Sequence, residues 1–257
     1  MVLLSAVCNA GLAQPAQGQG GTVLITGSNR GLGLELAKQY AAAGWRVIAT
    51  ARDPREAAEL QALAAGDADV RVEELDVLDA SELKALVAKL DGVPIDVLIN
   101  NAGVLGSQAG QTLGSLDYAE FERVMGVNVY APLAIADALR DNVAASRDKK
   151  IVAITSRSGI ISQPGFGGPP FYRASKIALN MTMHVLAAQL RERGVIVALV
   201  AAPPTDTDML RELIGRDNAA RMTRPADAVA GLIRVIGGLT LDNSSLPLYY
   251  DGTAMAW

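Results

Sequence analysis

The sequence is poor in the residues that build disulfides, zinc sites and histidine-based catalysis. Its 257 residues include one cysteine, Cys8, and one histidine, His184. One of each excludes a disulfide framework and a zinc site of the usual Cys/His kind. A Ser-His-Asp triad would need His184 as its base, but Met183 and Val185 beside it lie in a run with helical spacing. We therefore expect His184 to be a structural or surface residue.

Basic runs and aromatic residues are also scarce. No run of Lys or Arg is longer than Lys149-Lys150, and the net charge is −4. These features argue against nucleic acid or an anionic membrane surface as a partner. Aromatic residues make up only 4% of the chain, which disfavours a β-sandwich or a base-stacking platform. Half of the chain is apolar, so it can form one large α/β domain that hides about three quarters of its unfolded surface.

The first 21 residues differ from the rest of the chain. Residues 2–7 are apolar, and the small residues around Ala13 resemble a signal-peptide cleavage site. The positively charged start of such a signal is missing, because the first basic residue is Arg30. We predict a leader and linker over 1–21, one folded domain over 22–257, and a cytoplasmic location, with export to the periplasm as the alternative. The apolar stretch is too short to span a membrane.

From Thr22 onward, apolar strand-like runs alternate with segments of helical spacing. The strand-like runs cover residues 22–26, 45–50, 70–75, 95–99, 151–155, 195–201 and 246–250. The helical segments cover residues 31–43, 54–65, 79–90, 117–145, 172–193 and 226–236, with a bend expected near Pro132. Strands separated by helices need crossover connections, so the sheet should be mostly parallel and covered on both faces. The pattern predicts an α/β fold with a single Rossmann-type doubly wound sheet of about seven strands.

Three glycines stand between the first predicted strand and the first predicted helix. They occur in Thr26-Gly27-Ser28-Asn29-Arg30-Gly31-Leu32-Gly33. Glycines here permit a tight turn and a close approach of the backbone to a pyrophosphate, and the start of the helix offers free N–H groups. All residues from Gly27 to Gly33 are therefore candidates for dinucleotide binding.

Five motifs occur in the order typical of one enzyme family. They are the T-G-x-x-x-G-x-G loop, Asn100-Asn101-Ala102-Gly103, Asn128 in the long helix, Ser156 in S-x-x-G, and Tyr172-x-x-x-Lys176. The chain resembles the short-chain dehydrogenase/reductase family over residues 22–257, and its end, 250–257, is similar to that of the C-factor and sniffer-type carbonyl reductases. The resemblance implies an enzyme, a carbonyl reductase or alcohol dehydrogenase. Such an enzyme moves a hydride reversibly between a nicotinamide cofactor and a small-molecule carbonyl or alcohol.

Four residues are the candidate catalytic group: Asn128, Ser156, Tyr172 and Lys176. Tyr172 and Lys176 are four residues apart on one predicted helix and so share a face. A nearby ammonium lowers a tyrosine pKa from about 10 by about 1–3 units, which makes the phenol a usable acid or base. Ser156 can hydrogen-bond the same substrate oxygen. The resemblance assigns proton transfer to Tyr172, binding of the nicotinamide ribose to Lys176, and to Asn128 a water that links Lys176 to solvent.

The residue after the second strand favours NADP(H) over NAD(H). An acidic residue there would bind the adenosine ribose hydroxyls. This chain has Arg52, whose guanidinium can hold a 2′-phosphate through two hydrogen bonds. Arg30 can approach the same group, whereas Asp53 is counter-evidence. The resemblance adds further cofactor contacts at Asp76, Val77, Asn101, Ala102, Gly103 and Thr207.

The chain departs from the family after the sixth strand. Ala202-Pro203 stands where the family has Pro-Gly, and proline fixes φ and lacks an N–H. Because of this departure, the sequence does not establish whether that loop contacts the nicotinamide. It also leaves an alternative function, that of a catalytically silent NADP-binding redox sensor or signalling protein. The intact Tyr172 and Lys176 favour the enzyme. We further expect a homodimer or homotetramer through the two long helices, and an apolar substrate pocket near Leu105, Phe166, Phe171 and Met209.

Overall fold

A computed structural model describes residues 20–162, 167–244 and 246–256 of the chain. Most of the predicted leader, residues 1–19, therefore lies outside the described residues, and so does Phe166 of the predicted substrate pocket. Gly21 already contacts the sheet, because its carbonyl accepts a hydrogen bond from the N–H of Arg46 at 3.0 Å.

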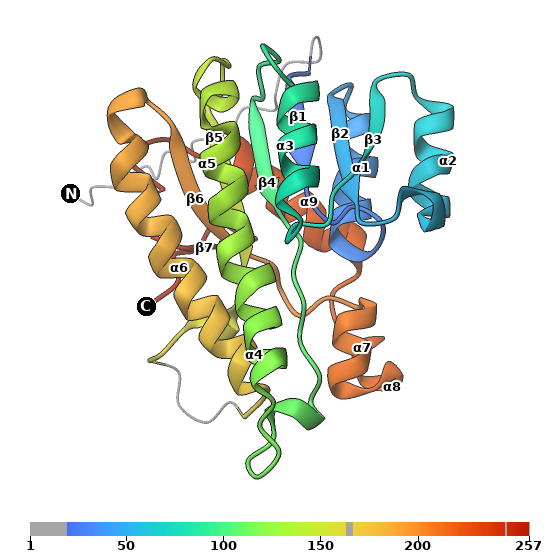
Figure 1. Ribbon diagram of the computed structural model, residues 1–257, viewed down its shortest axis with the longest axis vertical. Helices are drawn as coiled ribbons and strands as arrows, with labels where there is room; N and C mark the ends of the chain where they lie inside the picture. The colour runs from blue at the N-terminus through green and yellow to red at the C-terminus, as the bar shows by residue number, and fades with distance from the viewer. Residues whose placement is uncertain (1–19, 163–166, 245, 257) are drawn as a thin grey trace, which may run out of the picture.

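The centre of the protein is a seven-stranded sheet in which all neighbouring strands are parallel (Figure 1). The strands are β1 (Thr22–Ile25), β2 (Arg46–Ala51), β3 (Val70–Glu74), β4 (Val97–Asn100), β5 (Lys150–Thr155), β6 (Ile196–Ala201) and β7 (Leu248–Tyr249). Their order is β3-β2-β1-β4-β5-β6-β7, which confirms the expected doubly wound Rossmann-type fold. In such sheets, ligands bind at the carboxyl ends of the strands where the order reverses, here at β1 and β4.

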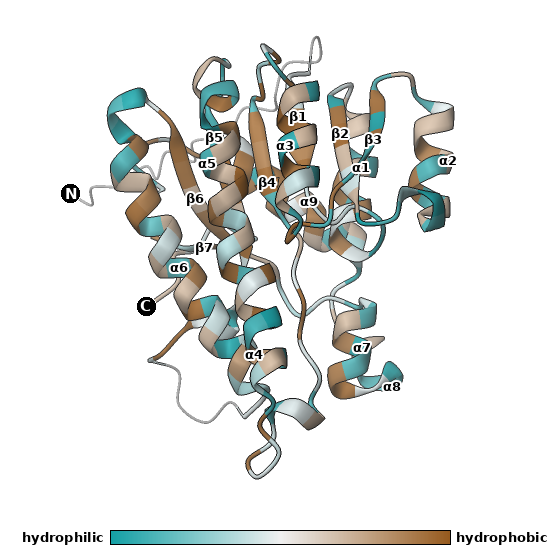
Figure 2. Cartoon of the chain, viewed as in Figure 1, coloured by the Kyte–Doolittle hydropathy of each residue, from teal (hydrophilic) through white to brown (hydrophobic). Residues whose placement is uncertain are grey.

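Helices cover both faces of the sheet because successive residues of a strand point to opposite sides. The helices are α1 (Gly31–Ala42), α2 (Ala58–Gly66), α3 (Ala80–Lys89), α4 (Tyr118–Met125), α5 (Ala131–Ala144), α6 (Pro170–Leu190), α7 (Asp208–Ile214), α8 (Arg216–Ala219) and α9 (Pro225–Gly237). Val23 and Ile25 of β1 pack with side chains of α1, α2 and α9, whereas Leu24 packs with side chains of α3, α5 and α6. Figure 2 shows the central strands as nearly continuous hydrophobic segments, as burial on both faces requires.

Two helical segments differ from the expectation. Residues 54–65 do not form one helix, because a 3₁₀-helix at Pro54–Glu56 ends at Ala57, whose ψ of 60° breaks the helical path before α2. Residues 117–145 form α4 and α5 with a π-helix, Gly126–Tyr130, between them. Pro132 has no N–H with which to bond the carbonyl four residues earlier, and the turn before it widens. The distortion therefore lies just before Pro132.

The last strand is shorter than expected. β7 contains only Leu248 and Tyr249, whereas the sequence predicts a strand over 246–250. Leu248 also forms an isolated antiparallel bridge with Ala254. The chain therefore folds back on itself at this edge instead of extending the sheet.

Candidate active site

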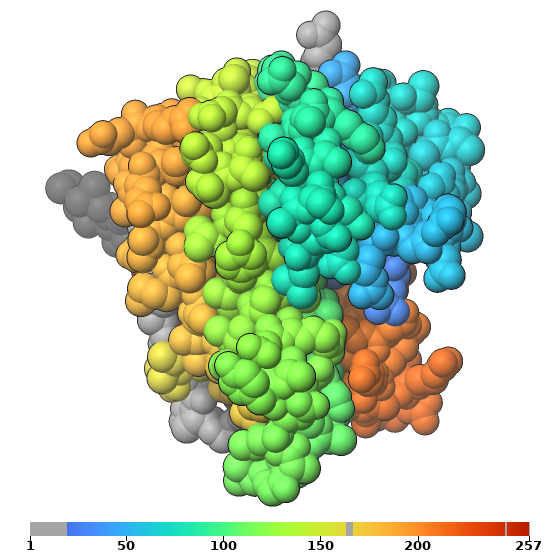
Figure 3. All heavy atoms as spheres, viewed as in Figure 1, coloured from blue at the N-terminus to red at the C-terminus, as the bar shows by residue number. Residues whose placement is uncertain are grey.

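The predicted site residues gather at the carboxyl ends of the strands. The glycine loop follows β1, Asn101 follows β4, Ser156 follows β5, and the segment leading to Thr207 follows β6. In Figure 1, α4, the first half of α6, and α7 with α8 extend beyond the sheet at this end. Figure 3 shows the α7–α8 segment, in orange, as a lobe beside the green segment of residues 105–125. The fold therefore brings segments far apart in the sequence to one edge.

The glycine loop has a backbone path that other residues would disturb. Gly27 and Gly31 have φ of +67° and +56°, in the left-handed region that glycine tolerates best. A Cβ at Gly33 would lie 2.1 Å from the carbonyl oxygen of Gly27. The side-chain amide of Asn101 donates to the carbonyls of Thr26 and Gly27 at 2.9 and 3.1 Å. Asn101 therefore stabilises the backbone of the glycine loop.

The residues inside the loop divide into supporting and exposed ones. Ser28 has no exposed surface, and its hydroxyl donates to the carbonyl of Ile25 at 2.9 Å, so Ser28 shapes the loop and does not line it. Leu32 packs against the core. Asn29 and Arg30 are exposed, and the first turn of α1 has neither a capping side chain nor an acidic residue. Such an uncapped helix start fits a phosphate group.

Two neighbouring residues after β2 differ in whether their charged groups are paired with another side chain. Arg52 is exposed, and no ion pair to it occurs among the described residues. Asp53 accepts hydrogen bonds from the backbone N–H and the guanidinium of Arg55 at 3.0 and 3.3 Å. These bonds to Arg55 hold the pKa of the Asp53 carboxyl below its usual value. The acidic residue that counted against NADP(H) is therefore already occupied.

The remaining predicted cofactor residues flank the same edge. Asp76 and Val77, which follow β3, are partly exposed, and the Asp76 carboxylate accepts a hydrogen bond from the N–H of Leu78 at 3.0 Å. A Cβ at Gly31 would lie 3.6 Å from Cγ2 of Thr207, so Thr207 stands directly beside the glycine loop. Ala202 packs against the core, although Ala202-Pro203 departs from the family pattern.

The structure brings Ser156, Tyr172 and Lys176 together. Ser156 lies beside Tyr172, and its hydroxyl acts to lower the pKa of the tyrosine. The Lys176 ammonium lies 5.7 Å from the centroid of the Tyr172 ring and donates to the carbonyl of Ile154 at 3.0 Å. Lys176 is only 6% exposed, so its charge is almost completely removed from bulk water.

Asn128 reaches the same group from the π-helix. Its Nδ2 donates to the carbonyl of Val104 and to the hydroxyl of Ser175, both at 2.9 Å, and its Oδ1 accepts from the N–H of Val104 at 2.8 Å. A Cβ at Gly103 would lie 3.4 Å from Asn128 Oδ1 and 3.9 Å from Lys176 Nζ. Gly103 therefore lies directly against both groups.

Burial decides the protonation of the central pair. Burial raises the pKa of Tyr172, and the hydrogen bond with Ser156 opposes that change. Burial lowers the pKa of Lys176 to about 8. The expectation that Lys176 lowers the pKa of Tyr172 is therefore corrected, because desolvation has the larger effect on both groups.

His184 is too far along α6 to act on Ser156. It follows Tyr172 by twelve residues, which is about 18 Å along a helix. Its side chain is exposed on the helix surface. Among the described residues, no group of three or more His, Cys, Asp and Glu side chains could hold a metal ion.

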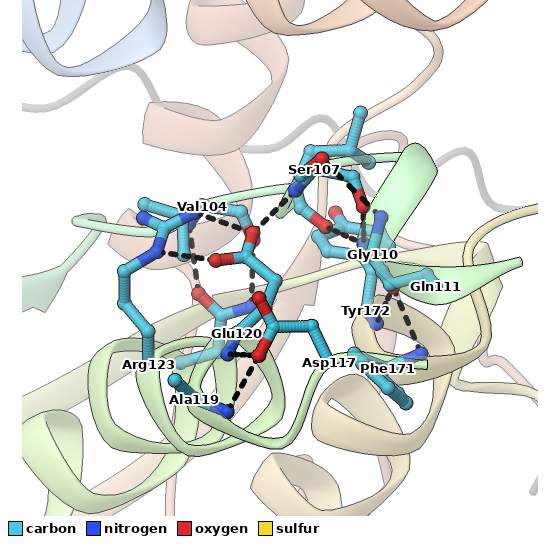
Figure 4. A network of polar contacts seen from close by, with 12 residues as sticks. Val104, Ser107, Gly110, Gln111, Asp117, Ala119, Glu120, Arg123, Phe171 and Tyr172 are labelled. Carbon is cyan, nitrogen blue, oxygen red and sulfur yellow. Dashed lines mark hydrogen bonds and ion pairs between the residues drawn. The ribbon is translucent and has the colours of Figure 1, made fainter. Parts of the chain in front are cut away.

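Two residues that no motif specifies make contacts at the site. Ser175 donates its hydroxyl to the carbonyl of Tyr172 at 2.7 Å and accepts from Asn128. Gln111, in the segment between β4 and α4, accepts from the N–H groups of Phe171 and Tyr172 at 2.9 and 3.2 Å. Figure 4 shows Gln111 directed at this first turn of α6. Gln111 has no motif that would predict this contact, because the two N–H groups that it accepts from are 60 and 61 residues away.

Comparison with known proteins agrees with this geometry. The chain matches the short chain dehydrogenase family over residues 21–218. The chain belongs to this family. It is 35% identical to the C-signal of Myxococcus xanthus over 176 residues, which are 68% of this chain and 100% of the relative.

Solved structures of carbonyl reductases share the fold. The NADPH-bound carbonyl reductase from chicken fatty liver is 29% identical with a TM-score of 0.83, over 92% of this chain and 98% of that chain. The carbonyl reductase Sniffer of D. melanogaster is 26% identical with a TM-score of 0.82, over 93% and 100%. The expected resemblance to sniffer-type carbonyl reductases is confirmed.

The short-chain dehydrogenase family consists of oxidoreductases that act on small molecules, and this member is similar to carbonyl reductases. No helix in the described ranges combines the length and apolar character needed to cross a membrane.

Proposed function

We propose that this protein is an NADP(H)-dependent carbonyl reductase or alcohol dehydrogenase in which Tyr172 is the proton donor and acceptor. The observation that carries the proposal is the buried ammonium of Lys176, 5.7 Å from the centroid of the Tyr172 ring, with Ser156 beside the same tyrosine. This group lies next to a glycine loop whose backbone admits a pyrophosphate.

The chemistry divides between cofactor and protein. When bound, the nicotinamide supplies the hydride that reduces the carbonyl carbon, or accepts it in the reverse direction. Tyr172 gives its hydroxyl proton to the carbonyl oxygen. Ser156 hydrogen-bonds the same oxygen and stabilises the charge that develops there. Lys176, whose ammonium lies 5.7 Å from the centroid of the Tyr172 ring, holds the ribose.

Asn128 helps to position the other three catalytic residues. Its amide joins Val104, after β4, to Ser175 on α6. It therefore fixes the catalytic helix against the segment that carries Gly103. The water-binding role that the resemblance assigns to Asn128 remains part of the proposal.

The selectivity for NADP(H) rests on Arg52 and Arg30. Both side chains are exposed at the edge where an adenosine 2′-phosphate would lie, and Arg30 is 3.9 Å from its nearest acidic partner, Asp208. Asp53 is engaged by Arg55 and so does not compete for the ribose. The NADPH-bound structure of the chicken reductase supports the same choice.

A hollow at the start of α6, lined by residues just before Tyr172, is the proposed entry for the substrate. It has a volume of about 120 Å³ and is lined by Gln108, Gln111, Thr112, Gly168, Pro169, Pro170 and Leu213. Its mixed lining suits a carbonyl compound with an apolar body. Phe171, of the predicted apolar pocket, packs edge-on against Phe121 with centroids 5.3 Å apart.

Oxidation of NADPH by the purified protein, with a panel of aldehydes, ketones and quinones, tests the proposal. NADH is measured in parallel. We expect turnover with NADPH, and a loss of about 10²–10⁴-fold in Tyr172→Phe because the proton donor is gone. Tyr130→Phe is the matched control, since Tyr130 is 66% exposed and should leave turnover unchanged. Equal activity of Tyr172→Phe and wild type would refute the assignment.

The alternative is a catalytically silent NADP-binding sensor or signalling protein. It is favoured by the similarity to a relative named C-signal and by Pro203-Pro204, which offers no N–H groups after β6. Tight NADPH binding without turnover across the panel would support this alternative. In either case we propose a cytoplasmic protein with a leader over residues 1–21 and self-association through the two long helical segments.

A further inference from the structure

The catalytic helix α6 cannot cap its own N-terminus. Its N-cap residue is Pro169 and its first residue is Pro170, and no local side chain accepts a hydrogen bond from the first turn. An N-cap side chain ordinarily accepts from the second or third N–H of a helix. In α6 those N–H groups belong to Phe171 and Tyr172, so the uncapped turn is the one that carries the proposed proton donor.

Gln111 supplies the missing cap from a distant segment. Its Oε1 accepts from Phe171 N at 2.9 Å and from Tyr172 N at 3.2 Å. Its Nε2 donates to the carbonyls of Leu105 and Ser107, both at 3.1 Å. The side chain is 3% exposed, and all four of its hydrogen-bonding positions are used.

The segment that carries Gln111 is itself held in place. Glu120 of α4 accepts from the N–H of Ser107 and is paired with Arg123 at 2.7 Å (Figure 4). The N–H of Asp117 donates to the carbonyl of Gly110 at 2.9 Å. Gln111 therefore joins α6 to a segment that is itself held to α4 by hydrogen bonds.

We propose that Gln111 is a positioning residue for proton transfer: as a non-local N-cap of α6, it fixes Tyr172 against Ser156 and Lys176. The proposal rests on the proposed function for its kinetic consequence, but the capping itself does not. Without the cap, the first turn of α6 loses its only side-chain acceptor among the described residues, and the Tyr172 ring loses its fixed distance from Ser156.

The main test is Gln111→Met, which keeps the length of the side chain and removes its hydrogen bonds. Two quantities are measured: kcat per NADPH-binding site, and hydrogen exchange of the amides of residues 171–173. We expect kcat per site to fall by about 10- to 100-fold, as displacement of a reacting group by about 1 Å can cause. NADPH affinity should change little, because the glycine loop is untouched, and exchange at 171–173 should accelerate.

A matched control separates positioning from general loss of stability. Asn142 also donates its amide to two carbonyls, those of Leu90 and Val93, at 2.7 and 2.9 Å, at the opposite end of the sheet. Asn142→Leu should lower thermal stability and leave kcat per site unchanged. If Gln111→Met and Asn142→Leu have the same kcat per site as wild type, the proposal is overturned.

Restoring a local cap gives a second test. Serine is a preferred N-cap residue, so Pro169→Ser offers the first turn an oxygen of its own. Added to Gln111→Met, it should slow the exchange at 171–173 and recover part of the lost kcat. If Gln111→Met does not fold, Gln111→Asn replaces it, because it keeps the amide but shortens its reach to the Phe171 and Tyr172 N–H groups, so exchange at 171–173 should accelerate and kcat per site should fall. Unchanged exchange and unchanged kcat per site in Gln111→Asn would count against the assignment of Gln111 as the cap.

The outcomes distinguish the two proposals. If wild type binds NADPH but reduces nothing in the panel, the proposed function fails. The exchange measurement still decides the role of Gln111, because protection at 171–173 does not require turnover. If hydrogen exchange at 171–173 is the same in Gln111→Met as in wild type, the assignment of Gln111 as the cap is overturned, whatever the activity.

Discussion

Replacement of Lys176 by methionine should make the protein more stable and inactive. Lys176 is 6% exposed, and burial lowers its pKa from 10.5 to about 8. This difference of about 2.5 pH units corresponds to a cost of about 3.4 kcal/mol for keeping the ammonium charged in the folded protein. Lys176→Met removes this cost but also removes the hydrogen bond to Ile154, which contributes about 1 kcal/mol. The net expected gain at pH 7 is about 2 kcal/mol.

The gain should depend on pH with a defined sign. The pKa of Lys176 is lower in the folded protein than in the unfolded chain, so the unfolded chain binds more protons between pH 8 and pH 10.5. The stability of wild type relative to Lys176→Met therefore rises with pH in this window. At pH 10 the remaining cost of the ammonium is about 0.8 kcal/mol, and the two proteins should be about equally stable.

Unfolding in guanidinium chloride at pH 7 and pH 10, without cofactor, measures both quantities. Lys150→Met is the matched control, because Lys150 is also buried but donates to two carbonyls, those of Ile236 and Gly237, at 2.9 and 3.0 Å. Burial also lowers the pKa of Lys150, but two hydrogen bonds offset that cost, so Lys150→Met should gain less stability than Lys176→Met and keep its activity. A Lys176→Met protein that is less stable than wild type at pH 7, or whose difference from wild type is independent of pH, would refute the desolvation argument.

Two further substitutions test the cofactor edge. Gly33→Ala places a Cβ 2.1 Å from the Gly27 carbonyl oxygen, so NADPH binding should weaken by at least about tenfold. Gly66→Ala is the control, because no atom lies within 4 Å of its Cβ and NADPH binding should be unchanged. Equilibrium titration of NADPH fluorescence compares the two variants. Arg52→Ala should weaken NADPH binding by about 10- to 100-fold and leave NADH binding unchanged, since only NADPH carries the 2′-phosphate. Equal losses for both cofactors would show that Arg52 does not select between them.

Much of the fold could be predicted from the sequence because its signals are local. The continuous apolar runs give the strands, and the glycine at position 44, with φ of +74°, ends α1 close to where the spacing predicts. The errors occur where a turn or cap within a short segment interrupts the repeating pattern. Residues 54–65 have helical spacing, but the cap at Asp53 favours a separate 3₁₀ turn. At 246–250 the bridge to Ala254 limits β7 to two residues.

The residues of the site could be predicted from the sequence only where a recognisable motif specifies them. Tyr172 and Lys176 are found from their spacing, but their charge states depend on burial, which the spacing does not reveal. Ser28 belongs to the motif, yet its burial shows that it supports the loop. Gln111 and Ser175 belong to no expected set, because their hydrogen bonds join segments 60 and 47 residues apart.

The position of α6 at the site depends on three successive groups of non-local contacts. Gln111 holds its first turn, the carbonyl of Ile154 holds Lys176 one turn later, and Asn180, bonded to Thr155 at 2.6 Å, holds the next. Two of these anchors belong to the end of β5, a rigid central strand, but the first belongs to the segment between β4 and α4. Proton transfer is therefore most sensitive to that segment, because a change there can move Tyr172 while the sheet and the glycine loop stay in place.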